Sequence, residues 1–251
     1  MTENSPNRSG DLLDLSIVIP CLNEEKNIED TLDAVTETLA ELPFSYEILV
    51  VDDGSTDATA SIVLRYGEAH PELPIKLHKN PRNRGFARSY VDAAFLTRGK
   101  YYRLVCGDNA EPKEALSAIF RNLGKADIVM PYHDRITGKP PLRRALSRGY
   151  TVMVNIFSGY NITYYNGCAI HLRYNVMRWG PYSFGFGFQA ELITRLLDEG
   201  ATYIEIPVPN IHREKEKGSS AINLKNFLSV GHTLLEIFIR RLRRQMFQER
   251  K

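Results

Sequence analysis

The sequence has little cysteine, little net charge and no long apolar run. Its three cysteines, Cys21, Cys106 and Cys168, are widely spaced, which argues against a disulfide framework and against a zinc cluster of the CxxC type. They suit a reducing cytosol, so we expect a cytoplasmic protein. With 32 Lys and Arg against 30 Asp and Glu, the chain lacks the basic surplus of a nucleic-acid-binding protein, and we expect no nucleic-acid partner.

Apolar segments are too short to cross a membrane. A spanning helix needs roughly 20 apolar residues, and the best candidate, residues 227–239, contains His232 and Glu236. The first residues are polar and lack the apolar core of a signal peptide. We therefore expect a disordered N-terminus over residues 1–14.

The chain does have an ordinary globular composition, with 43% apolar and 25% charged residues. Short runs rich in β-branched residues alternate with segments whose apolar residues recur every three or four positions. This alternation predicts an α/β fold with a mostly parallel sheet flanked by helices, although the pattern fades over residues 132–188. The expected strands are residues 15–20, 46–51, 75–78, 101–105, 127–130 and 203–208, and the expected helices are residues 24–42, 57–66, 85–96 and 190–199.

Polar, acidic and glycine-bearing residues follow the expected strands. In a parallel sheet, ligands bind beyond the carboxyl ends of the strands, so these residues are candidates for a ligand site. Asp52 and Asp53 stand at one such end and suit the hydroxyls and ring N–H groups of a nucleoside. The same segment also fits a plain strand-to-helix turn, in which Gly54 bends the chain and Ser55 or Asp57 caps the helix.

Three segments together resemble one known family. They are SIVIP at residues 16–20 followed by Asn23-Glu24, VVDDGSTD at residues 50–57, and Asn83-Arg84-Gly85. Their order and spacing resemble the nucleotide-sugar-binding half of the family 2 inverting glycosyltransferases. A later arginine-rich segment makes the chain most similar, within that family, to dolichol-phosphate mannose synthases and polyprenyl-phosphate glycosyltransferases.

The resemblance implies a Rossmann-like GT-A fold and a nucleoside diphosphate sugar as donor. The residues that it places around the donor are Pro20, Asn23, Glu24, Asp52, Asp53, Arg84 and Gly85. It also implies that a basic loop containing glycine and serine grips the diphosphate, and Arg213, Lys217 and Ser219 match that loop. The alternative for this loop is a solvated segment of mixed charge.

The same resemblance implies a divalent metal ion. In the family, a DxD-type motif after the fourth strand holds the ion on the diphosphate, and here that place reads Cys106-Gly107-Asp108. A thiol is a poor ligand for a hard ion such as Mg²⁺. We expect Asp108, helped by Glu111 and diphosphate oxygens, to hold Mg²⁺ or Mn²⁺; the alternatives are charge neutralisation by Arg or Lys, and an inactive site.

A basic segment is expected to bind the acceptor. The resemblance assigns contacts with a lipid phosphate to Arg135, Arg143 and Ser147. Positions 143 and 147 share a face if a helix begins near Pro141. These three residues and Asp108 form the expected catalytic set.

The acceptor class decides whether a base is required. A phosphate monoester is largely ionised near neutral pH, since its second pKa is about 6, and needs no strong base. A hydroxyl acceptor does need one, and the candidates are Asp108, Glu111 and Glu191. Gln189 and Glu191 are also candidates for the acceptor side, although the aromatic residues around them fit plain packing.

The final expected element is an amphipathic basic helix over residues 222–251, after a glycosyltransferase domain over residues 15–221. From Arg240 to Lys251 six residues are basic and only Glu249 is acidic. An apolar face beside arginines fits a helix lying on an anionic membrane surface as well as one packed on the core.

These expectations combine into one function. The enzyme would transfer a hexose from a UDP- or GDP-sugar to a polyprenyl phosphate, with inversion, as a peripheral protein on the cytoplasmic face of a membrane, with room for a separate membrane partner subunit. Two alternatives keep the donor site: a glycosyltransferase with a non-lipid hydroxyl acceptor, and a catalytically degenerate homologue that only binds nucleotide.

Overall fold

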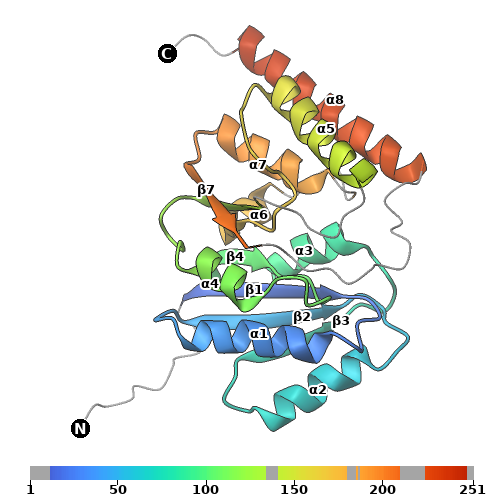
Figure 1. Cartoon of the computed structure of the whole chain (residues 1–251), viewed down its shortest axis with the longest axis vertical. Coiled ribbons are helices and arrows are strands. Elements are labelled where there is room, and N and C mark those ends of the chain that lie inside the picture. The colour runs from blue at the N-terminus through green and yellow to red at the C-terminus, as the bar shows by residue number, and fades with distance from the viewer. Residues whose placement is uncertain (1–11, 134–140, 180–184, 186, 210–223, 248–251) are drawn as a thin grey trace.

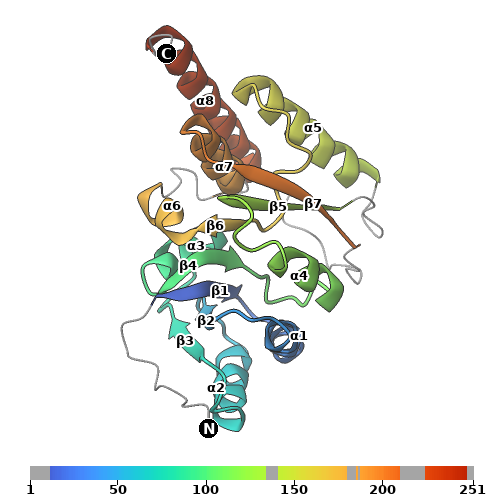
Figure 2. The same ribbon diagram turned by 90° about the vertical axis from the view of Figure 1, so that its left-hand side faces the viewer.

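The computed structural model describes residues 12–133, 141–179, 185, 187–209 and 224–247. They form one mixed sheet with helices on both faces (Figures 1 and 2). The strands are β1 (Leu13–Cys21), β2 (Tyr46–Asp52), β3 (Ile75–Lys79), β4 (Gly99–Leu104), β5 (Ile128–His133), β6 (Ile170–Leu172) and β7 (Tyr203–Val208). The helices are α1 (Ile28–Ala40), α2 (Thr59–Ala69), α3 (Phe86–Ala94), α4 (Lys113–Phe120), α5 (Pro141–Ser158), α6 (Arg173–Arg178), α7 (Phe188–Asp198) and α8 (Leu224–Phe247).

The strand order is β3-β2-β1-β4-β6-β5-β7. Strand β6 runs antiparallel to β4 and β5, and the other pairs are parallel, which confirms the expected α/β fold with a mostly parallel sheet. Because β1 pairs with both β2 and β4, the order of the strands reverses there. The carboxyl ends of β1, β2 and β4 therefore border the crevice in which sheets of this type bind ligands.

Two buried clusters cover the two faces of the sheet. Successive residues of a strand face opposite sides, so Val18 packs with residues of α3 and α5–α8, whereas Ile17 and Ile19 pack with residues of α1, α2 and α4. All three are fully buried. Burial on both faces explains why the β1 sequence is a continuous apolar run without polar alternation.

The first helix and the first strand begin at places other than those predicted. Helix α1 begins at Ile28 and not at residue 24, because the N–H groups of Glu24 and Glu25 donate to the side chains of Thr59, at the start of α2, and of Asp57, in the loop before it. Strand β1 begins at Leu13, within the segment expected to be disordered. Residues 1–11 of that segment lie outside the described residues.

Three short elements were not predicted. Helix α4 follows the loop that carries Asp108, and α6 follows β6 directly. Strand β6 has only three residues, which is too short for an apolar period to be recognised. Its antiparallel pairing closes the gap between the parallel β1–β4 half and the β5–β7 pair.

Helices α5 and α8 pack side by side at one end of the molecule (Figures 1 and 2). Both expose apolar side chains that other surface helices bury. On α5 these are Leu142, Leu146, Val152, Met153 and Ile156, and on α8 they are Leu228, Leu235, Phe238, Leu242, Met246 and Phe247. Over the residues described here, no helix combines the length and apolarity needed to span a bilayer.

Candidate active site

The loops after β1 and β2 are joined by reciprocal hydrogen bonds. The N–H of Asn23 donates to Oγ of Ser55 (3.0 Å), and Oδ1 of Asn23 accepts from the N–H of Thr56 (2.8 Å). The N–H of Glu24 donates to Oγ1 of Thr59 (2.8 Å). These contacts fix the edge of the sheet where the expected donor residues Pro20, Asn23 and Glu24 lie.

Asp53 organises the neighbouring loop after β3. Its Oδ1 accepts from Nδ2 of Asn80 (2.7 Å) and from the N–H of Arg84 (3.0 Å), and its Oδ2 accepts from the N–H of Gly85 (2.8 Å). Asp53 is 4% exposed. Since both of its oxygens hold the loop, Asp53 shapes this part of the site through main-chain atoms of the expected residues Arg84 and Gly85.

Close backbone packing holds the same corner together. Gly54 has a φ of +85°, and a Cβ there would lie 2.8 Å from the backbone N of Asn83. The buried carboxylate of Asp52 accepts from the N–H of Ser55 (2.8 Å) and closes the turn. The two adjacent aspartates that suggested a nucleoside contact thus brace the turn and the loop, while the Arg84 side chain is exposed and pairs with Asp92 at 2.7 Å.

Negative charge collects at the carboxyl ends of β1 and β4. Partial burial raises the pKa of Glu24, and although a hydrogen bond from Asn27 lowers it, the charges of Asp108 and Asp57 raise it further. Burial raises the pKa of the Cys21 thiol in the same neighbourhood, with further contributions from these carboxylates. The structure therefore brings Glu24 and Asp108, which are far apart in the sequence, to one edge of the sheet.

The loop that carries Asp108 is held by a buried ion pair. Arg103, on β4, is fully buried; its Nη2 donates to Oε1 of Glu111 (2.6 Å), and its Nε donates to the carbonyl oxygen of Cys168 (3.1 Å). The second carboxylate oxygen of Glu111 is buried and has no hydrogen-bond partner within the described part of the chain. Thus one oxygen of Glu111 is engaged by Arg103, and the other is buried without a partner among the described residues.

Cys106 stands where the family motif has its first aspartate. A hydrogen bond with Cys168 is the main cause that raises its pKa, and burial adds to it. A protonated thiol supplies neither the charge nor the hard oxygen that Mg²⁺ prefers. Cys106 therefore does not replace the missing carboxylate.

The carboxylates of Asp108 and Glu111 fit a divalent ion that takes most of its ligands from substrate phosphates and water. In the described residues, no three His, Cys, Asp or Glu side chains are gathered as a metal site. Mg²⁺ is commonly held by one or two carboxylates together with substrate phosphates and water. Asp108 and the unpartnered oxygen of Glu111 meet that requirement, and the acidic edge around Glu24 favours a cation.

The residues expected to contact the acceptor phosphate and the donor diphosphate are only partly within the described residues. Arg135, Arg213, Lys217 and Ser219 lie outside them. Arg143 is placed by its backbone on α5, which confirms the helix predicted from near Pro141. On that helix, position 143 shares a face with Ser147, which is half-buried.

Tyr150 lies one turn beyond Ser147 on the same face of α5 and was not predicted. It is 8% exposed, and its hydroxyl has no hydrogen-bond partner among the residues described. Burial raises its pKa, and the nearby Tyr165 and Glu191 raise it further. Glu191 itself is fully buried on α7 and pairs with Arg195 at 3.4 Å.

Arg103 was also missed, although a signal was present. An arginine within the apolar run of β4 has to find a carboxylate in the core, and Glu111 is the next acidic residue after Asp108. Tyr150 carried no such signal, because a tyrosine in an amphipathic helix is ordinary.

Curated relatives are sugar transferases that act on lipid phosphates. A dolichyl-phosphate beta-glucosyltransferase of Dictyostelium discoideum is 39% identical over 101 residues, 38% of this chain and 31% of that protein. The dolichyl-phosphate beta-glucosyltransferase ALG5C of Trichomonas vaginalis is 27% identical over 89% of this chain and 70% of its own length. A dodecaprenyl-phosphate galacturonate synthase of Rhizobium johnstonii is 30% identical over 43% of this chain and 32% of its own length. The match thus spans about a third of two of these relatives.

Solved structures share the fold at low sequence identity. Glucosyl-3-phosphoglycerate synthase of Mycobacterium tuberculosis in complex with UDP has a TM-score of 0.69 at 17% identity, covering 90% of this chain and 80% of that one. The mannosyltransferase PcManGT of Pyrobaculum calidifontis, in complex with GDP-Man and Mn²⁺, has a TM-score of 0.62 at 19% identity, covering 93% of this chain and 65% of that one. These likenesses confirm the expected GT-A fold.

One family model covers more than half of the chain. The model described as Glycosyl transferase family 2 matches residues 16–179, which begin within β1, run through β6 and α6, and include the edge that carries Asp53 and Asp108. This confirms the family indicated by the three sequence segments. The chain belongs to glycosyl transferase family 2.

Proposed function

We propose that the protein transfers a hexose from a UDP- or GDP-sugar to a polyprenyl phosphate, with inversion, at the surface of a membrane. The observation that carries this proposal is the pair of outward apolar faces on α5 and α8. An enzyme whose acceptor is dissolved in water has no use for them, whereas a lipid acceptor is met at a bilayer. The names of the curated relatives support the same acceptor class.

Helix α5 has two different faces. Val152 is 55% exposed and Ile156 is 63% exposed, and both lie on the outward side. Ser147 and Tyr150 lie on the opposite side, which also carries position 143. This arrangement supports a helix that touches lipid with one face and presents Arg143, Ser147 and the Tyr150 hydroxyl to a lipid phosphate with the other.

The reaction we propose is a single displacement. An oxygen of the lipid phosphate attacks the anomeric carbon, the bond from that carbon to the donor diphosphate breaks, and the nucleoside diphosphate leaves from the opposite face, which inverts the configuration. The attacking oxygen is already ionised, because the second pKa of a phosphate monoester is about 6. No side chain therefore has to act as a strong base.

Residues of the sheet edge bind and orient the donor. The backbone of residues 84–85, fixed by Asp53, and the loop of Asn23 and Glu24 border the nucleoside side. Asp108 and Glu111 would hold Mg²⁺ or Mn²⁺, which supplies positive charge to the leaving diphosphate. Arg213, Lys217 and Ser219 are proposed to contact the diphosphate from their loop.

The location of the protein follows from the same proposal. We place it in the cytoplasm, bound peripherally to the cytoplasmic face of a membrane through α5 and the basic end of α8. Arginines near an anionic bilayer contribute about 1 kcal/mol each. A membrane partner subunit is compatible with this location and is not required for the chemistry.

The test is sugar transfer by the purified chain. The protein is incubated with UDP- and GDP-sugars and a polyprenyl phosphate in detergent, with Mg²⁺, Mn²⁺ or EDTA, and glycolipid is measured by mass spectrometry. We expect one donor to yield a glycosyl phosphate lipid and EDTA to abolish it. Nucleotide binding without product from any acceptor would instead identify the chain as a degenerate homologue, with Cys106 as the obvious lesion.

A further inference from the structure

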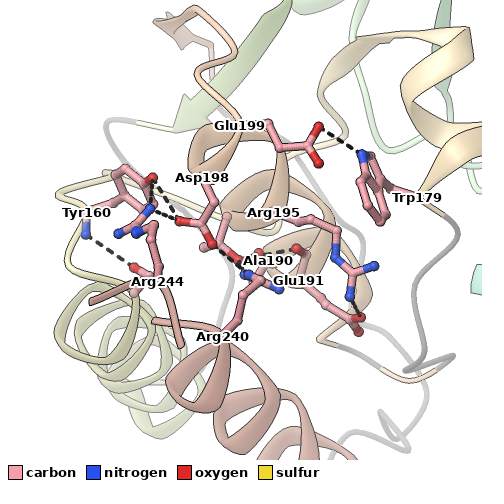
Figure 3. A network of polar contacts seen from close by, with 11 residues as sticks. Tyr160, Trp179, Ala190, Glu191, Arg195, Asp198, Glu199, Arg240 and Arg244 are labelled. Carbon is pink, nitrogen blue, oxygen red and sulfur yellow. Dashed lines mark hydrogen bonds and ion pairs between the residues drawn. The ribbon is translucent and has the colours of Figure 1, made fainter. Parts of the chain in front are cut away.

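A cavity of about 300 Å³ lies where α6, α7 and α8 meet, away from the carboxyl edge of β1, β2 and β4. Figure 3 shows the side chains of α7 and α8 that converge there. Most of its lining residues are charged, and four of them are arginines. The lining residues are Trp179, Arg195, Asp198, Glu199, Arg240, Arg243 and Arg244.

Both acidic residues of this wall are already paired. Asp198 accepts from Nε of Arg240 (2.6 Å), from the hydroxyl of Tyr160 (2.9 Å) and from Arg244. One carboxylate oxygen of Glu199, Oε2, accepts from both Nε1 of Trp179 (3.0 Å) and Nη2 of Arg178 (2.7 Å). Neither carboxylate is therefore available to neutralise a further cation.

The cavity consequently carries a surplus of positive charge. Among the described residues, Arg178 pairs with Glu199, and Arg240 and Arg244 both pair with Asp198. Together with Arg243, these are four arginines against two carboxylates, which leaves two positive charges over. Arg243 is exposed, and among the described side chains none pairs with it. A surplus of this kind around a concave site attracts an anion.

Exposed apolar residues stand next to Arg243 on α8. Leu242 and Met246 are 37% and 65% exposed and continue the outward stripe of α8 that begins at Leu228. Trp179, on the cavity wall, is an amphipathic ring of the type that sits at membrane interfaces. A phospholipid combines an anionic phosphate with apolar acyl chains. A cationic cavity next to an exposed apolar stripe suits both parts of such a molecule.

We propose that this cavity binds the phosphate headgroup of an anionic phospholipid of the membrane, with Arg243 as a direct contact and Arg195 and Arg240 lining the pocket. The volume, at the lower end of the range of about 300–1,000 Å³ for ligand pockets, suits a glycerophosphate group and is small for a nucleotide sugar. The site is separate from the donor site and would select the membrane on which the enzyme works. It rests on the membrane association proposed above.

Trp179 makes the proposal directly measurable, because it is the only tryptophan of the chain and lies in the cavity wall. Its emission is followed while the protein is titrated with dihexanoyl phosphatidylglycerol below its micelle concentration. Dihexanoyl phosphatidylcholine and inorganic phosphate are titrated in parallel. We expect a saturable change with phosphatidylglycerol at concentrations at which neither of the other two ligands produces one.

Arg243→Gln should weaken that binding about tenfold or more, since it removes a charge-assisted contact without disturbing a buried group. Arg144→Gln, which removes an exposed arginine of α5, is the matched control and should leave the titration unchanged. Equal responses to phosphatidylglycerol and phosphate would mean a free-phosphate site and overturn the lipid assignment. No response to any ligand, or equal loss in both variants, would overturn the site itself.

Vesicle binding separates this inference from the proposed function. If the chain binds phosphatidylcholine vesicles and transfers sugar but gains no affinity from added phosphatidylglycerol, the headgroup site is wrong and the proposed function stands. If Trp179 reports phosphatidylglycerol binding while no glycolipid is formed, the site stands and the proposed function fails.

Discussion

Arg103 and Glu111 form an ion pair of 2.6 Å beneath the loop that carries Asp108. Arg103 is fully buried, and the Arg103 and Glu111 side chains are 0% and 10% exposed. A pair buried to this degree is costly to break because the remaining charge loses its partner. We therefore expect the position of Asp108, and with it the proposed site for the donor diphosphate, to depend on this contact.

Breaking the pair should destabilise the fold strongly. Arg103→Met leaves Glu111 as an uncompensated buried charge, and we expect a loss of about 3–5 kcal/mol in the free energy of unfolding, measured by urea denaturation. The double variant Arg103→Met/Glu111→Met should recover most of it. Arg121→Met, which removes an exposed partner of Glu41, is the control and should change stability by less than about 0.5 kcal/mol. A double variant as unstable as the single one would show that the unpaired charge of Glu111 does not cause the loss of stability.

Asp108 should be needed for turnover and not for folding. Asp108→Asn keeps the size of the side chain and removes the charge that would hold a divalent ion on the diphosphate, so we expect sugar transfer to fall at least about 100-fold with little change in melting temperature. Asp30→Asn, an exposed change on α1, serves as the matched control. Activity within a few-fold of the unmodified protein would remove Asp108 from the mechanism.

His171 should make the fold sensitive to acid. Burial lowers its pKa to about 4, and its Nδ1 has no partner within the described residues. Because the unfolded chain has a histidine pKa of about 6.5, it binds the proton first. Stability is therefore complete above about pH 6.5 and falls as the pH drops toward 4, by about 3 kcal/mol in all.

The check is the urea midpoint as a function of pH. His171→Leu should flatten the decline between pH 6.5 and 4, whereas His70→Gln, at an exposed histidine, should leave it in place. If both variants lose stability in parallel with the unmodified protein, other groups cause the acid sensitivity.

Gly54 should be required for the close packing of the turn after β2 against the loop after β3, where we propose that the donor binds. An alanine there needs a φ of +85° and places its Cβ 2.8 Å from the backbone N of Asn83, so the loop after β3 has to move. We expect Gly54→Ala to destabilise the protein by about 1–3 kcal/mol and to weaken nucleotide binding, measured by calorimetry. Gly67→Ala on α2, where an added Cβ would meet no atom within 4 Å beyond its chain neighbours and the backbone of its own helix, is the matched control and should stabilise slightly.

The longer helices and strands of this chain were predictable because their apolar pattern extends over enough residues to be recognised. The strand 203–208 was predicted with the bounds that β7 has, and the βαβ order from residue 15 to residue 105 was correct. The start of α1 was not predictable. The N–H groups of Glu24 and Glu25 bind the side chains of Thr59 and Asp57, and the apolar pattern of the α1 segment does not reveal these tertiary contacts. Strand β6 was missed because three residues carry no period.

The sequence indicates which residues lie at the candidate site, but it does not reveal what each of them contacts. The sequence places Asp53 at a strand end, yet only the structure reveals that both of its oxygens hold the loop of residues 80–85. The ion pair of Glu111 depends on a tertiary contact with Arg103. The assignments to Arg135, Arg213, Lys217 and Ser219 stay predictions, since these residues lie outside the described part of the chain.

The most direct test of the account is a comparison of two acceptors that differ only in their phosphate. With the productive nucleotide sugar, polyprenyl phosphate and the matching polyprenol are offered to the protein and to Arg143→Ala, and products are measured by mass spectrometry. We expect product from the phosphate alone and at least about a tenfold loss of transfer in Arg143→Ala, through a raised KM for the lipid. Equal transfer to the polyprenol, unaffected by Arg143→Ala, would contradict it.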